Sequence, residues 1–92
     1  MADWTHRGEY ISAKHQVTPE HADEALDDPN AVTFDPDYNS QSGDSIRTIG
    51  YSISARRVLS VITVEDDGIV YGANAWKSNS RDRQYYQQGG PR

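Results

Sequence analysis

Residues 57–76 read Arg57-Val-Leu-Ser-Val-Ile-Thr-Val-Glu-Asp-Asp-Gly-Ile-Val-Tyr-Gly-Ala-Asn-Ala-Trp76. Two runs rich in β-branched and aromatic residues flank a turn that contains Asp-Gly, the strongest short-range signal for a β-hairpin. We therefore expect two antiparallel strands, Arg57–Glu65 and Ile69–Trp76. The first of them is apolar on both faces.

Two further strands are predicted before this hairpin. Ile46–Ile53 is joined to the hairpin by the short link 54–56, which suits antiparallel pairing. Ala31–Phe34 is a shorter candidate, and the turn-rich loop 35–44 separates it from the next strand. The expected sheet is an antiparallel meander of three to four strands.

Side chains alternate between the two faces of a strand, which predicts which residues lie together. In the strand that begins at Ile46, one face is expected to carry Arg47, Ile49, Tyr51 and Ile53. In the last strand, one face is expected to carry Val70, Gly72, Asn74 and Trp76.

Three helices are predicted around the sheet. The first runs from Thr5 to about His15, with an apolar stripe at Trp4, Ile11 and His15. The second is capped by Thr18 with Pro19 at its first position, and it stops before Pro29. Asn79 can cap a third, which Gly89-Gly90-Pro91 terminates. The predicted class is α+β.

The chain has 92 residues, which allows one domain over residues 1–92; we expect order over about 4–88 and a tail at 89–92. It has no cysteine, so disulfides, thiolate nucleophiles and cysteine-based metal sites are excluded. His6 and His21 lack metal-ligand spacing, and no metal site or cofactor is expected. Without a long apolar stretch, neither secretion nor membrane insertion is indicated, and the expected compartment is the cytoplasm.

Charge is distributed unevenly along the chain. Residues 1–45 hold 2 Lys plus Arg and 10 Asp plus Glu, a local charge of −8. Residues 46–92 hold 7 Lys plus Arg and 4 Asp plus Glu, a local charge of +3, which gives the total of −5. A basic C-terminal half in an acidic protein indicates an anionic partner for that half.

An ordered set of short motifs then resembles one known family. The motifs are Lys14-His15-Gln16-Val17-Thr18, Ala25 with Asp28-Pro29, Arg47-Thr-Ile-Gly-Tyr-Ser52, Arg57-Val-Leu-Ser-Val-Ile-Thr63, Ala75-Trp76-Lys77, and Arg81-Asp82-Arg83 with Tyr86. In order and spacing, they resemble the BrnT-like toxins of the RelE superfamily over roughly Trp4 to Gln88. The chain departs from the family at Trp76, where an arginine is common.

The resemblance implies a bacterial toxin of a type II toxin–antitoxin pair, with helices packed on a curved antiparallel sheet. The implied activity is metal-independent cleavage of mRNA, with or without the ribosome, which inhibits translation and growth. The implied partner is a cognate antitoxin protein that blocks the site in a hetero-oligomer.

Cleaving RNA without a metal requires a group that takes the 2′-hydroxyl proton, a cation for the phosphate, and an acid for the leaving oxygen. The residues expected to divide these roles are His15, Arg47, Lys77, Arg83 and Tyr86. Further contacts to RNA are expected from Asn74, Trp76, Tyr51 and Arg81. Trp76 would stack on a base.

Plainer roles remain open for these residues. His15 continues the stripe of the first helix, and Arg47 is either a solvated cation at the sheet edge, paired with the acidic N-terminal helix, or a phosphate ligand. Lys77 suits solvent as well as RNA, and the tyrosines of the last helix suit packing. The alternative function is a non-catalytic module of the same fold that binds an antitoxin-like protein or RNA.

Overall fold

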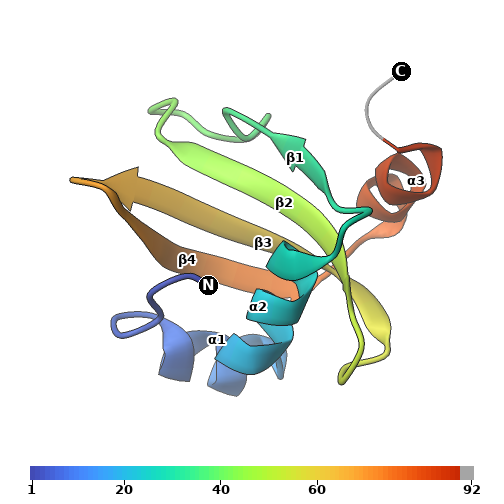
Figure 1. Cartoon of the computed structure of the whole chain (residues 1–92), viewed down its shortest axis with the longest axis horizontal. Helices are drawn as coiled ribbons and strands as arrows, with labels where there is room; N and C mark the ends of the chain where they lie inside the picture. Colours follow the sequence, from blue (N-terminus) through green and yellow to red (C-terminus); the bar gives the residue numbers. More distant parts are fainter. Residues whose placement is uncertain (90–92) are drawn as a thin grey trace.

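The computed structural model describes residues 1–89 and shows an α+β fold in that range (Figure 1). In chain order its elements are α1 (Gly8–His15), α2 (Pro19–Asp27), β1 (Val32–Phe34), β2 (Ser45–Ser52), β3 (Arg57–Asp66), β4 (Ile69–Lys77) and α3 (Ser80–Gln88). The predicted class, with N-terminal helices, an antiparallel sheet and a C-terminal helix, is confirmed. Residues 90–92 of the predicted tail lie outside the described range.

The sheet is a meander in the order β1-β2-β3-β4, and every neighbouring pair is antiparallel. The tight turn between β3 and β4 places Asp67 and Gly68 at positive φ, as the Asp-Gly signal predicts. Arg57 pairs with Ser52 and Arg47 with Ile62, so β2 and β3 stay in register along their whole length. This register fixes which side chains share a face.

The two N-terminal helices cover one face of the sheet, α2 against β2 and β3 and α1 against β4 (Figure 1). At the start of α2, the Thr18 hydroxyl accepts a hydrogen bond from the His21 amide, and His21 Nδ1 accepts one from the Thr18 amide. α1 begins at Gly8, three residues later than predicted. The amides of Arg7 and Gly8 instead close a turn onto the carbonyl of Trp4.

The core lies between these helices and the sheet. Its fully buried side chains include Ile11, Val17, Ala22, Ala25, Leu59, Val61 and Ala75. α2 approaches β2 so closely that a Cβ at Gly50 would lie 2.0 Å from the carbonyl oxygen of Ala25. Only glycine permits this contact, which brings the acidic end of α2 onto the end of β2.

A β-bulge in β4 changes the predicted faces. Ile62 pairs with Asn74 and Thr63 with Gly72, so Ala73 is an extra residue without a partner on β3. Beyond the bulge, Ala75 faces the helices opposite Val61. The prediction that Gly72, Asn74 and Trp76 share one face is therefore wrong, because the bulge reverses the alternation after Gly72.

The N-terminal segment holds the bulge in place. Asp3 bridges β4 in parallel, its amide donating to Val70 and its carbonyl accepting from Gly72. Arg7 Nε donates to the carbonyl of the bulged residue Ala73 at 2.9 Å. These contacts supply hydrogen-bond partners to an edge that would otherwise be open.

The C-terminal helix α3 packs against the other face of the sheet. Asn79 caps it by accepting a hydrogen bond from the Asp82 amide, and Gly89 ends it in the left-handed conformation, as predicted. Phe34, Tyr38 and Tyr85 form an aromatic contact at this face, with ring centroids 5.0 to 6.1 Å apart. α3 and the loop after β1 thus enclose part of the face opposite α1 and α2.

Candidate functional site

A polar cluster, here called the Arg47 cluster, lies between the sheet and α3. It consists of Asp37, Tyr38, Arg47, Ser60, Ser78 and Asp82. Arg47 Nε donates to Asp37 Oδ1 and Nη1 donates to Asp82 Oδ2, both at 2.7 Å. Nη1 also donates to the Tyr38 hydroxyl at 2.8 Å. Only 3% of Arg47 is exposed to solvent.

The same hydrogen bonds fix Asp82 as an anion. Its carboxylate accepts from the hydroxyls of Tyr38 and Ser60, the second at 2.6 Å, while Ser78 lies 2.7 Å from Ser60. Burial alone raises the pKa of Asp82, but the hydrogen bonds from Ser60, Tyr38 and Arg47 outweigh it, so the pKa lies below its ordinary value. The cluster therefore carries two carboxylates around one guanidinium.

This geometry answers the question left open for Arg47. The cation is not solvated and does not pair with an N-terminal helix; its partners come from the loop after β1 and from α3. A phosphate would reach the guanidinium only by displacing a buried carboxylate, and breaking such a pair costs about 3–5 kcal/mol. In this arrangement Arg47 holds α3 and the loop against the sheet.

The two predicted phosphate ligands also point to opposite faces. Arg47 lies opposite Ile62, whereas Lys77 lies opposite Leu59, three residues away on β3. Residues an odd number apart on a regular strand face opposite sides. Lys77 is exposed at the end of β4, on the face that the N-terminal helices cover. Arg47 and Lys77 therefore do not form one phosphate site here.

The structure does bring His15 and Trp76 together, at the edge of β4. Their ring centroids lie 6.3 Å apart, and the Tyr10 ring meets His15 edge-on at 6.1 Å. Cations lie over this row of rings: the Arg7 guanidinium is 3.9 Å from the Tyr10 centroid and Lys14 Nζ is 5.4 Å from it. We call these five residues, Arg7, Tyr10, Lys14, His15 and Trp76, the β4-edge surface.

The β4-edge surface remains accessible to solvent. Tyr10 is 36% exposed, Lys14 is exposed, and His15 and Trp76 are half-buried. A hydrogen bond with Lys14 lowers the pKa of the Tyr10 hydroxyl. Interleaved cations and aromatic rings with open faces are the pattern of single-stranded nucleic-acid sites.

Trp76 also touches the buried cluster, because the Arg47 guanidinium lies 5.1 Å from its ring centroid. This indole is thus one wall shared by the two regions. Asn74, on the same face, turns its side-chain oxygen to the amide of Ala75 at 3.0 Å. Its carbonyl is therefore occupied by its own strand.

The remaining predicted residues lie elsewhere. The Tyr86 hydroxyl donates to Asp28 at 2.6 Å, which raises the pKa of Tyr86 to about 12. Arg83 donates to the carbonyl of Ser78, and the Arg81 guanidinium lies 4.6 Å from the Tyr38 ring centroid. Tyr51 lines a groove with Tyr86. None of these four residues contacts the β4-edge surface in the described interactions.

Three members of the β4-edge surface, Arg7, Tyr10 and Lys14, were missed by the sequence prediction. A signal for them was present, because the three follow one another at spacings of 3 and 4 residues. Such spacing places side chains on one face of a helix. The sequence did not show that this face would lie beside β4.

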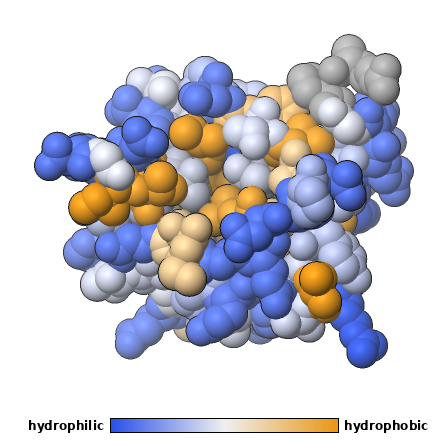
Figure 2. Space-filling view, in the orientation of Figure 1, coloured by the Kyte–Doolittle hydropathy of each residue, from blue (hydrophilic) through white to orange (hydrophobic). Residues whose placement is uncertain are grey.

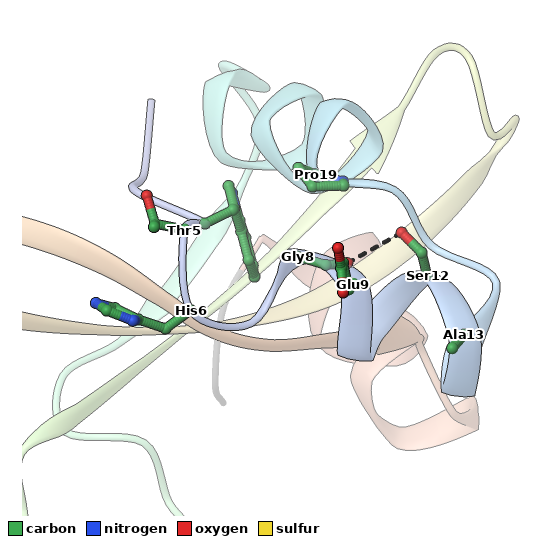
Figure 3. A pocket seen from close by; sticks show the side chains of 8 residues that line it. Thr5, His6, Gly8, Glu9, Ser12, Ala13 and Pro19 are labelled. Carbon is green, nitrogen blue, oxygen red and sulfur yellow. Dashed lines mark hydrogen bonds between the residues drawn. The ribbon is translucent and has the colours of Figure 1, made fainter.

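The largest cleft, of about 670 Å³, lies between the N-terminal segment, α1 and the start of α2. Figure 3 shows Pro19 across the cleft from Gly8 and Glu9, with His6 at the far end. It holds none of the predicted site residues, and its acidic Glu9 does not suit a phosphate. On the face seen in Figure 2, hydrophilic residues dominate and apolar ones emerge in separate patches.

Two further searches concern residues 1–89. No group of three or more His, Asp or Glu side chains there could hold a metal ion. None of the helices in this range is both long and apolar enough to cross a membrane.

Comparison with known proteins found no family model and no curated protein that matches the chain.

Proposed function

We propose that this protein is the toxin of a type II toxin–antitoxin pair and cleaves mRNA in the bacterial cytoplasm at the β4-edge surface. The observation that carries the proposal is the meeting of His15 with Trp76 beside two cations and a tyrosine. The resemblance to BrnT-like toxins supports it, as does the α+β fold. A cognate antitoxin would then restrain the activity.

In this proposal His15 removes the proton from the RNA 2′-hydroxyl, because histidine is the side chain that most often performs such transfers. The freed 2′-oxygen attacks the phosphorus and the bond to the 5′-oxygen breaks. That oxygen takes a proton from the Tyr10 hydroxyl, whose lowered pKa makes it a better donor. Arg7 and Lys14 stabilise the charge on the phosphate.

Trp76 contributes binding in the same scheme. A base stacked on an accessible indole is worth about 1–3 kcal/mol by alanine substitution. The indole is held from behind by Arg47, so its plane is fixed before RNA arrives. Lys77, the next residue and exposed, is placed to meet a neighbouring phosphate.

The test is inducible expression of the chain in a bacterial host, with growth and bulk mRNA followed together. We expect growth arrest with loss of mRNA, both relieved by His15→Gln. The matched control is His6→Gln, a histidine outside the β4-edge surface, which should remain toxic. If the unaltered chain accumulates as folded protein while growth and mRNA stay normal, the ribonuclease proposal is wrong.

A second candidate function is favoured by the state of Arg47. Its charge is taken up by Asp37 and Asp82, which leaves the β4-edge surface with fewer cations than the sequence predicts for cleavage. The candidate is a non-catalytic module that binds RNA or an antitoxin-like protein through the same surface. Purified protein that binds single-stranded RNA and leaves it intact would favour this function.

A further inference from the structure

A second groove, of about 400 Å³, lies where the end of α2, the end of β2 and α3 meet. The residues that matter in it are Glu24, Asp27, Asp28, Tyr51, Ile53 and Tyr86. Two apolar side chains stand open at its wall, with Ile53 75% exposed and Tyr51 38% exposed. We call it the α2–α3 groove.

The aromatic walls of the groove are fixed by Asp28. One oxygen of this carboxylate accepts from the Tyr86 hydroxyl at 2.6 Å and from the Tyr51 amide at 2.8 Å. The hydroxyl bond joins α3 to the end of α2, and the amide bond joins the same point to β2. Both rings are therefore set in position without a ligand.

The carboxylates around the groove stay ionised. Hydrogen bonds from the side chain and amide of Ser54, and from Ser52, lower the pKa of Glu24 to about 2. Burial raises the pKa of Asp28, but hydrogen bonds from Tyr86, Asn30 and Tyr51 outweigh it and the pKa is lowered. Asp27 is exposed beside them.

No cation of the described chain compensates this charge. Over residues 1–89, the ion pairs are those of Arg47 with Asp37 and with Asp82. An apolar groove with a rim of three carboxylates complements a side chain that is apolar along its stem and cationic at its tip. Arginine and lysine have this form, and arginine also stacks on tyrosine rings.

We propose that the α2–α3 groove docks a cationic segment of a partner protein. An arginine or lysine of that segment packs its stem on Ile53 and Tyr51 and places its charge among Asp27, Asp28 and Glu24. An apolar neighbour in the segment covers the rest of Ile53. RNA does not suit this groove, because the carboxylates repel phosphate. The inference does not depend on RNA cleavage.

The test uses purified protein and a fluorescently labelled peptide of alternating arginine and leucine, with a peptide of alternating glutamate and leucine as its control. We expect saturable binding of the arginine peptide that weakens with added salt, and no binding of the glutamate peptide. Ile53→Ser should weaken binding roughly tenfold, as expected for loss of a buried isoleucine side chain. Asp27→Asn should weaken it by roughly threefold, the effect of an exposed ion pair.

Both substitutions lie at exposed positions, so the fold is expected to survive them. The matched control is Glu65→Gln, an exposed carboxylate near the end of β3 and outside the groove, which should bind as the unaltered chain does. Equal binding by all variants, or no binding at all, would overturn the proposal. So would a concentration-dependent dimer that Ile53→Ser abolishes, because the occupant would then be a second copy of this chain.

Discussion

The Arg47 cluster and the β4-edge surface use the same kinds of side chain in opposite ways. In the cluster, a guanidinium and a tyrosine are enclosed with two carboxylates, and only 3% of Arg47 meets solvent. At the edge, Arg7 and Lys14 lie over an exposed tyrosine beside a histidine. The first arrangement uses its charge to hold helix and loop together, and the second leaves its charge available to a ligand.

Burial and partner decide between these outcomes. A buried cation keeps its charge only when carboxylates and hydrogen bonds replace water, and those partners then block other anions. An exposed cation over a ring is weakly held and can exchange partners. Binding should therefore depend on the edge, and stability on the cluster.

The strongest way to break this comparison is Arg47→Ala. The change leaves Asp37 and Asp82 buried without their cation, and removing one partner of a buried pair costs about 3–5 kcal/mol. Urea unfolding measures the loss. Arg57→Ala, which removes an exposed arginine from the start of β3, is the matched control and should stay within about 0.5 kcal/mol of the original. Equal stability of the two variants would show that the cluster is not structural.

Trp76→Ala tests the other side of the comparison. We expect affinity for a single-stranded RNA oligonucleotide to fall by about 1–3 kcal/mol, because the stacking plane is lost. Fluorescence anisotropy measures the binding. Trp76→Phe keeps an aromatic ring and should retain most of the affinity. If Trp76→Ala binds RNA as well as the original does, the β4-edge surface is not the RNA site.

Arg7→Ala should have a smaller effect, on stability. It removes the hydrogen bond to the carbonyl of Ala73, which is worth about 1 kcal/mol. Amide hydrogen exchange should show faster opening at residues 73–75, and Arg7→Lys should restore part of the protection. Unchanged exchange in Arg7→Ala would mean that the bulge holds itself.

An alkaline titration should separate the two regions without changing stability much near neutral pH. Lys14 lowers the pKa of Tyr10, whereas burial and the hydrogen bond to Asp82 raise the pKa of Tyr38 above its ordinary value of 10.0. Because Tyr38 has the higher pKa in the folded state, its contribution to stability is complete below pH 10.0 and is lost as pH rises through the folded pKa.

Tyrosinate absorbance, compared between Tyr10→Phe and Tyr38→Phe, assigns the two transitions. We expect the earlier transition to be missing from Tyr10→Phe and the later one from Tyr38→Phe. The reverse order would mean that the enclosed tyrosine is the one at the edge.

Most of the fold followed from local patterns in the sequence. Asp67-Gly68 indicated the hairpin, Thr18 and Pro19 the start of α2, and Asn79 the start of α3; each signal acts through its own neighbours. The site followed less well. A cation on a strand can be enclosed or solvated, and the partners of Arg47 lie 10 and 35 residues away along the chain.

The bulge is the other reason that the site could not be derived in full. Nothing in Gly72-Ala73-Asn74 distinguishes an extra residue from a regular strand, so simple alternation placed Trp76 with Gly72. The contact between His15 and Trp76 was likewise hidden, because it joins a helix to the strand edge beside it. Long-range packing decided both.

The bulge at Ala73 has a consequence for how chains of this kind can diverge. A point substitution changes one side chain, but loss of the single codon for Ala73 would exchange the faces of residues 74–77 all at once. The indole would then turn toward α1 and α2, and the surface beside His15 would disappear in one genetic event. An alignment of distant relatives should therefore be checked for a one-residue gap at this position before their tryptophans or arginines are compared.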